Sequence, residues 1–229
     1  MSAGGDGPVT VLARGEGLAA WRQIADGLGE RHARVRRPVM GGQGLEPVLV
    51  QTKLLFRGQQ AQGTVADHPY PPLTKNYHYE AELVAALGKG GRNISIDKAL
   101  DLVYGYTLGL DMTRRDLQDE AKALRRPWEV SKSADHSAPI GLLHPVAAVG
   151  HLARGTIRLA VNDVVKQNAD LSAMIWSVPE QIAILSRYFE LKAGDLIFSG
   201  TPEGVGAVVK GDRLKVSIDT LGAIDLVVV

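Results

Sequence analysis

The sequence contains no cysteine, and this absence excludes several kinds of site at once. No disulfide, thiolate metal centre or cysteine nucleophile can form, and the redox compartment is left open. An excess of charge is missing too. The formal net charge is +1, which gives no reason to expect nucleic acid or an anionic membrane as a partner. The composition is otherwise ordinary for a soluble globular protein, with 45% hydrophobic and 22% charged residues.

Long apolar runs and several familiar enzyme motifs are also absent. No stretch approaches the ~20 apolar residues of a membrane-spanning helix, and residues 1–17 lack the basic start and apolar core of a secretory signal. We therefore expect a soluble, cytoplasmic protein. The sequence has no Gly-x-Ser-x-Gly elbow, phosphate loop or GxGxxG motif, so the glycine-rich stretches 88–91 and 200–206 are interpreted as tight turns.

The chain divides into an irregular start and an orderly remainder. Residues 1–65 form an atypical, glycine- and arginine-rich segment, with a helix predicted at 17–28, a basic connector after it and a strand predicted at 47–56. From Tyr77 onward, predicted strands outnumber predicted helices and do not alternate regularly with them. This pattern predicts a mixed, β-rich α/β fold with few short helices over 66–229, and not a doubly wound sheet.

Two carboxylates stand close together in "YHYEAELVAAL", which is predicted to be a strand. Side chains at positions i and i+2 of a strand point to the same face, so Glu80 and Glu82 project together. With Asp111, which follows the apolar run "YGYTLGL", they would give a hard divalent cation an all-oxygen site. The alternative is a solvated pair of charges on an exposed strand. His78 shares the face of Glu80 and is either a ligand or, as we favour, a surface residue.

A group of cations and an amide follows Asp111. Such side chains suit a substrate that carries a carboxylate or forms an enolate, because they donate hydrogen bonds to negatively charged oxygen. The group consists of Arg114, Arg115, Gln118 and Lys132. The alternative is a solvated helix of mixed charge, and we favour that interpretation for Arg114, Arg125 and Arg126. Thr201 follows the apolar strand "DLIFSG" and can present its hydroxyl to a site.

Four long motifs resemble the fumarylacetoacetate hydrolase family. They are "HYEAELVAALGKGG", "YGYTLGLDMTRRDLQDEAKALRRPWEVSKSADHSAPIG", "VNDVVKQNADLSAMIW" and "GDLIFSGTPEGVGAVVKGDRL". The resemblance runs from about Pro69 to Leu221 and implies the mixed β-roll of the family's C-terminal domain and a homodimer. It also implies hydrolysis of a carbon–carbon bond in an acylpyruvate, with fumarylpyruvate as the expected substrate and fumarate and pyruvate as products, in the breakdown of aromatic compounds.

The resemblance also assigns roles to individual residues. Glu80, Glu82 and Asp111 fall on the family's ligands for Mg²⁺ or Mn²⁺. Arg115, Gln118 and Lys132 fall on positions that contact substrate, with Gln118 and Lys132 expected to stabilise negative charge on oxygen. Thr201 falls on the threonine that meets the substrate carboxylate.

The N-terminal part of the sequence departs from the family. The family's general base is a histidine paired with a following glutamate, whereas here the nearest histidine, His32, has Glu30 before it. His32 is the candidate base and His68 a weaker one, while Lys53 is a faint echo of a family lysine. Residues 1–65 are either divergent or the product of a shifted reading frame. Two other functions therefore stay open: decarboxylation of oxaloacetate, which needs no activated water, and a non-catalytic protein that binds metal and ligand.

Overall fold

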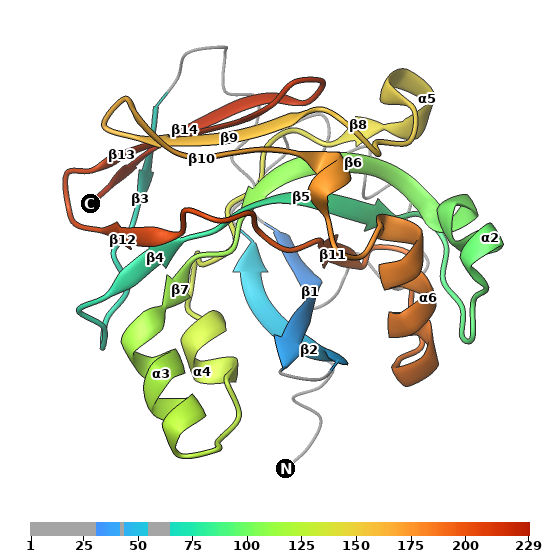
Figure 1. Cartoon of the computed structure of the whole chain (residues 1–229), viewed down its shortest axis with the longest axis horizontal. Coiled ribbons are helices and arrows are strands. Elements are labelled where there is room, and N and C mark those ends of the chain that lie inside the picture. Colours follow the sequence, from blue (N-terminus) through green and yellow to red (C-terminus); the bar gives the residue numbers. More distant parts are fainter. Residues whose placement is uncertain (1–30, 42–43, 55–64) are drawn as a thin grey trace.

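The computed structural model describes residues 31–41, 44–54 and 65–229, with the first two ranges described by their backbone. Most of the regular structure is strand (Figure 1). The strands are β1 Arg31–Gly41, β2 Gly44–Leu54, β3 Ala66–His68, β4 Tyr77–Tyr79, β5 Ala81–Leu87, β6 Val103–Leu110, β7 Thr113–Arg114, β8 His144–Pro145, β9 Thr156–Val161, β10 Val164–Asp170, β11 Leu196–Phe198, β12 Gly206–Val208, β13 Arg213–Ile218 and β14 Gly222–Val228. The predicted β-rich fold is confirmed.

The helices are short. They are α2 Ile96–Ala99, α3 Arg115–Ala123, α4 Glu129–Lys132, α5 Val146–Val149 and α6 Val178–Tyr188, with 3₁₀ turns η3 Leu100–Leu102 and η4 Leu171–Ala173. Helix α6 begins with a capping box, in which the Ser177 backbone N–H donates to Glu180. Among the described residues, no helix is long and apolar enough to cross a membrane.

The strands form three sheets. A six-stranded sheet has the order β2-β1-β11-β5-β6-β8, a five-stranded sheet has the order β10-β9-β13-β14-β3, and a small sheet has the order β12-β4-β7. Neighbouring strands are antiparallel except for β1 beside β11 and β3 beside β14. The five-stranded sheet lies across one side of the molecule, and α3 and α4 lie together at the far end of the small sheet (Figure 1).

Strand β5 is buried on both faces, which explains its unbroken apolar run. Leu83, Ala85 and Leu87 point into the main core, which also takes the inward residues of β9, β13 and α6. Val84 and Ala86 point the other way, into a second apolar cluster with Ile140, Leu196 and Phe198. Glu82 projects from the same face of β5 as Val84 and Ala86, so its carboxylate lies on the side of the second, smaller cluster.

The structure corrects two expectations about strands. The predicted strand "YHYEAELVAAL" is in fact two strands in different sheets, β4 and β5, and the chain changes sheet at Glu80. The segment predicted as a connector contains β1, which pairs along its whole length with β2. Strand β2 confirms the strand predicted at 47–56.

Two further predictions concern the N-terminal segment. The helix predicted at 17–28 lies outside the described residues. The boundary predicted near residue 65 stays a prediction, although β1 and β2 belong to the same sheet as β5.

Helix α6 packs one face into the main core. Ile182 and Leu185 are fully buried, whereas Tyr188, the last residue of the helix, is 59% exposed.

Candidate metal centre and active site

Three carboxylates meet at the junction of β4, β5 and β6. One oxygen each from Glu80, Glu82 and Asp111 lies within 4.8 Å of the others, and all three residues are buried. Antiparallel pairing opposes Ala81 and Leu110, and the Asp111 N–H donates to the Glu80 carbonyl at 2.8 Å. The backbone therefore fixes the spacing of the three acids. The predicted proximity of these residues is confirmed, although Glu80 lies between β4 and β5 and not within one strand.

A buried lysine joins two of these acids. The Lys132 ammonium, at the end of α4, donates to Glu80 Oε2 at 2.7 Å, to Asp111 Oδ2 at 3.0 Å and to the Thr113 hydroxyl at 2.7 Å. The Arg115 guanidinium contacts the other oxygen of Glu80. Burial alone would raise the pKa of Glu80, but Lys132 and Arg115 outweigh it and hold that pKa below its usual range.

The residues present fit a hard divalent cation. Carboxylate oxygens are the donors that Mg²⁺ and Mn²⁺ prefer. When all five groups are ionised, the three carboxylates exceed the cations Lys132 and Arg115 by one negative charge. A divalent cation would turn this excess into one positive charge, which favours an anionic substrate.

Arg115 is held by two further side chains. Its guanidinium donates to Gln118 Oε1 at 2.6 Å and to His78 Nδ1 at 3.4 Å. Because Nδ1 accepts, Nε2 carries the hydrogen and donates to Asn76 Oδ1 at 2.8 Å. Burial, followed by the charge of Arg115, lowers the pKa of His78. His78 is thus a partly buried support for Arg115, and not the surface residue that the sequence favoured.

The loop 199–204 connects the carboxylates to a second wall of the site. The Gly200 N–H donates to Glu82 Oε2 at 2.8 Å, and the Tyr79 hydroxyl donates to the Gly204 carbonyl at 3.0 Å. Buried Gln181 donates to the Ser199 carbonyl at 3.0 Å. Thr201 is therefore presented, partly exposed, by a loop that is fixed on both sides.

Similarity to known proteins identifies the family of this chain. Residues 31–229 match the family described as fumarylacetoacetate (FAA) hydrolase C-terminal. The chain belongs to this family. Its mixed β-roll is the family fold that the motifs implied, and family membership identifies the chain as a hydrolase of carbon–carbon bonds whose fold and acidic triad suit a divalent metal.

Individual members of the fumarylacetoacetate hydrolase family are similar over much of the chain. The fumarylpyruvate hydrolase of Ralstonia sp is 48% identical over 159 residues, covering 69% of this chain and 82% of that protein. The mitochondrial oxaloacetate tautomerase of Bos taurus is 39% identical over 148 residues, covering 65% and 67%. A crystal structure of fumarylpyruvate hydrolase from Pseudomonas aeruginosa, in complex with Mn²⁺ and pyruvate, superposes with a TM-score of 0.80 at 42% identity, covering 87% and 91%.

The two histidines considered as general bases, His68 and His32, lie in different parts of the fold. His68 is 1% exposed, stacks on Tyr77 and shares a hydrogen bond of 3.0 Å with the Tyr77 hydroxyl, so it has a structural role in the core. His32 lies in β1 opposite Lys53 of β2, and its side chain lies outside the described part of the protein. The role of His32 as base stays a prediction.

The arginines expected on a solvated helix separate into two groups. Arg125 and Arg126 are exposed, as expected. Arg114 is 8% exposed and donates to the backbone carbonyls of Pro72 and Val130, so the expectation of a solvated side chain was wrong. Its cation holds the proline-rich loop and α4 together, because buried carbonyl groups need donors.

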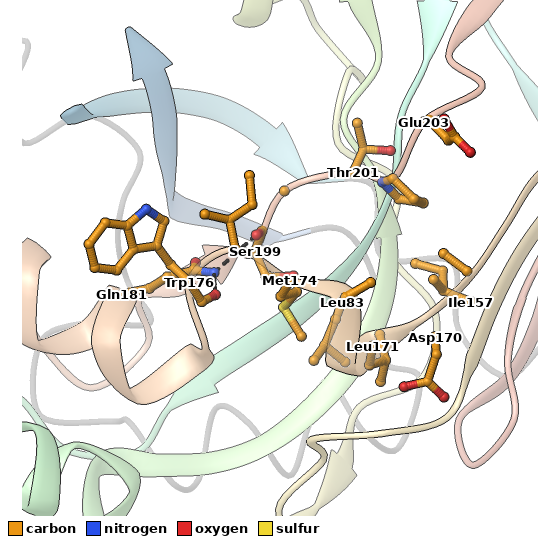
Figure 2. Close-up of a pocket in the computed structure, with 15 residues that line it drawn as sticks. Leu83, Ile157, Asp170, Leu171, Met174, Trp176, Gln181, Ser199, Thr201 and Glu203 are labelled. Carbon is orange, nitrogen blue, oxygen red and sulfur yellow. Dashed lines mark hydrogen bonds between the residues drawn. The ribbon is translucent and has the colours of Figure 1, made fainter. Parts of the chain in front are cut away.

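A cavity of about 490 Å³ lies against the loop 199–204 (Figure 2). Most of its lining is apolar, including Leu83, Ile157 and Met174, and the loop contributes Thr201 and Glu203. Leu83 faces away from Glu82 because consecutive residues of a strand alternate. The cavity and the acidic cluster are therefore neighbouring spaces that share one loop.

Proposed function

We propose that this protein is a divalent-metal-dependent acylpyruvate hydrolase, with fumarylpyruvate as its substrate. One observation carries the proposal: three buried carboxylates converge within 4.8 Å beside the ammonium of Lys132. This arrangement joins a cation site to a donor for negatively charged oxygen. The 48% identity with a fumarylpyruvate hydrolase supports the choice of substrate.

Glu80, Glu82 and Asp111 would hold the metal, Mg²⁺ or Mn²⁺. When bound, it supplies Lewis-acid stabilisation of negative charge on the substrate's oxygens. The neighbouring structure of a fumarylpyruvate hydrolase with Mn²⁺ and pyruvate supports this assignment.

The chain's own residues then bind and orient the substrate. Arg115, positioned by Gln118 and His78, presents donors to an anionic group, and Thr201 presents its hydroxyl to the substrate carboxylate. Water adds to the acyl carbonyl, the carbon–carbon bond breaks, and its electron pair passes to the pyruvate half as an enolate. Lys132 and Gln118 stabilise the developing negative charge, and protonation of the enolate carbon completes pyruvate. The other product is a carboxylic acid.

The attacking water needs a base, and His32 is the candidate that we propose. A His32→Ala variant should lose hydrolysis while it keeps its affinity for Mn²⁺. Equal rates in His32→Ala and the parent protein would remove His32 from the mechanism. In that event, translation of the upstream gene in the other two frames would show whether a His…Glu segment is encoded there.

Oxaloacetate is a second candidate substrate. A relative of 39% identity is named for oxaloacetate tautomerisation, and enolate chemistry on oxaloacetate needs the same charge stabilisation without an activated water. The absence of the family's His–Glu pair from the sequence would harm decarboxylation less than hydrolysis.

A substrate panel separates these functions. The full chain, loaded with Mn²⁺ or Mg²⁺, is given fumarylpyruvate, other acylpyruvates or oxaloacetate, and pyruvate and fumarate are measured separately. We expect fumarate and pyruvate in equal amounts from fumarylpyruvate, and no product from a Glu82→Gln variant. Pyruvate from oxaloacetate alone would replace our first choice by decarboxylation. Metal binding without turnover of any substrate would indicate a binding protein.

The homodimer is also a proposal. Light scattering of the purified full chain tests it directly, and a mass of one chain would contradict it.

A further inference from the structure

A buried glutamine of β10 connects the two walls of the site. Gln167 is 1% exposed, although the residues around it in β10 are largely exposed. Its Oε1 accepts from the Ala81 N–H at 3.1 Å, and its Nε2 donates to the Thr201 hydroxyl and to the Pro202 carbonyl, each at 2.8 Å. Ala81 stands between Glu80 and Glu82. One side chain therefore joins the carboxylate strand to the loop of Thr201.

The local backbone is built to turn this side chain inward. The register of β10 against β9 shifts between Val165 and Gln167, so Lys166 is the extra residue of a β-bulge. Bulges re-aim the side chains beside them. The bulge also contacts the loop directly: a Cβ at Gly204, where φ is +96°, would lie 2.0 Å from the Lys166 carbonyl oxygen.

The contacts of Gln167 fix the orientation of its amide. The Ala81 N–H can only donate, so it must face Oε1, and the Pro202 carbonyl can only accept, so it must face Nε2. The second hydrogen of Nε2 then points at Thr201 Oγ1. The Thr201 oxygen is an acceptor in this bond, and its own hydrogen stays available for another partner.

We propose that Gln167 is a positioning residue that makes Thr201 a hydrogen-bond donor toward an acceptor oxygen of the substrate, namely its carboxylate. The inference rests on the proposed function, in which Thr201 meets that carboxylate. Gln167 acts through Thr201 and through the backbone between two metal ligands. Gln167 makes Thr201 the donor in its contact with the substrate. Without this neighbour, a threonine hydroxyl can rotate and serve as either acceptor or donor.

The test measures binding of pyruvate, and of oxalate as a mimic of its enolate, to the Mn²⁺-loaded full chain by calorimetry. Gln167→Met keeps the length of the side chain but removes both hydrogen-bonding groups. We expect the affinity for both anions to fall by about 10- to 100-fold, the range for a hydrogen bond to a charged group, with Mn²⁺ affinity unchanged. In hydrolysis, KM should rise by a larger factor than kcat falls.

A double-mutant cycle with Thr201→Val distinguishes positioning from a general structural role. If Gln167 acts through Thr201, Gln167→Met should weaken pyruvate binding little further in the Thr201→Val background. The matched control is Gln181→Met, because Gln181 is equally buried and holds the Ser199 carbonyl of the same loop without contacting Thr201. Its effect should be a lower melting temperature, with no coupling to Thr201→Val.

A second variant, Gln167→Glu, guards against a failure of Gln167→Met to fold. The new carboxylate would accept from the Thr201 hydroxyl and turn its hydrogen away from the ligand, so pyruvate affinity should fall at least as far. Additive effects of Gln167 and Thr201 substitutions, or unchanged pyruvate affinity in Gln167→Met, would overturn the inference while hydrolysis stands. Coupled losses of pyruvate affinity without cleavage of any acylpyruvate would uphold the inference and overturn the hydrolase proposal. A parent protein that binds neither pyruvate nor oxalate would overturn both.

Discussion

The ion pairs of this protein lie in two contrasting environments. In the Lys132–Glu80 pair, the side chains are only 6% and 9% exposed, and Asp111 joins them at 3.0 Å. In the Arg213–Asp225 pair, the side chains are 48% and 12% exposed, and two parallel bonds of 2.8 and 2.6 Å link neighbouring strands of the terminal hairpin. The hydrogen bonds of the Arg213–Asp225 pair are as short as those of the Lys132 cluster.

The difference lies in what each pair contributes. Removing charges from water costs several kcal/mol per ion, and attraction between them often fails to offset that cost. A buried cluster of three acids is therefore a poor way to stabilise a fold and a good way to hold a cation. Arg213 stays half exposed, so the Arg213–Asp225 pair has less desolvation to offset than the buried cluster, and its small contribution goes to the hairpin. Substitutions in the buried cluster should therefore change activity strongly, whereas a substitution in the hairpin should lower stability slightly and leave activity unchanged.

The largest effect is expected from Glu82→Gln. The amide keeps an acceptor for the Gly200 N–H but removes the negative charge. Mn²⁺ affinity should fall by more than the ~10–100-fold that follows loss of a group supporting a metal ligand, and hydrolysis should be lost with it. Calorimetry with Mn²⁺ measures the first and a pyruvate assay the second. An unchanged Mn²⁺ affinity would remove Glu82 from the metal site.

The next effect is expected from Lys132→Met. Loss of the ammonium should lower kcat by about 10²–10³-fold, the usual cost of removing one donor to developing negative charge. Mn²⁺ should bind no more weakly, because a competing cation has been removed.

The same variant also tests the role of Lys132 in stability. The metal-free protein should lose ~3–5 kcal/mol in its free energy of unfolding, since Glu80 and Asp111 lose a buried partner, and Mn²⁺ should restore part of it. Lys89→Met, at an exposed position, is the matched control for both measurements. A kcat equal to that of the parent protein would contradict the proposed role.

A smaller effect is expected from Asp116→Asn. Burial raises the pKa of Asp116, but donors from Lys75, Thr74 and Leu117 outweigh it and hold that pKa below its usual range. Because the pKa is lower in the folded state, this stabilisation is present above about pH 3.9, the ordinary pKa of an aspartate. It is lost as the pH falls through the lower, folded value.

Urea unfolding measures this effect across the pH range. Asp116→Asn should cost about 1 kcal/mol at pH 7, and the difference from the parent protein should vanish in acid. A difference that stays constant down to acid pH would show that the carboxylate charge is not involved.

The smallest effect is expected from Arg213→Ala. Loss of this exposed pair should lower the melting temperature by no more than about 2–4 °C and leave kcat unchanged, and high salt should reduce the difference further. Thermal unfolding at two salt concentrations checks this. A large fall in kcat would show that the hairpin matters to the active site, and the contrast between the two regions would fail.

Much of the site was predictable because short-range rules govern it. Glu80 and Glu82 were predicted to lie on one side of a single strand, and they converge although the chain changes sheet at Glu80. The apolar run before Asp111 forms the strand that ends beside them. Antiparallel pairing of β5 with β6 then placed all three acids together. Strands β6 and β11 formed at the apolar runs "YGYTLGL" and "DLIFSG", since each run carries its own local pattern.

Other features had no local signal. Arg114 and Arg115 are adjacent, yet Arg114 binds backbone carbonyls and Arg115 contacts Glu80, because the chain passes from β7 into α3 between them. In the sequence, Gln167 resembles the other polar residues of an exposed strand. In the structure, a β-bulge lies beside it and its amide donates to Thr201. His78 was placed on the surface because the arginine that covers it is 37 residues away.

The sequence by itself determined that this protein is rich in strands, has no thiol chemistry and carries three acids with cations after the third. Composition and spacing along one chain suffice for such statements. Only the tertiary structure decided that Lys132 bridges two of the acids, that Glu80 stands at a change of sheet, and that a glutamine of the five-stranded sheet donates to the Thr201 hydroxyl. These contacts join residues 21 to 52 positions apart, or lie where the chain changes sheet. Strand pairing and burial position them, and no local pattern encodes either.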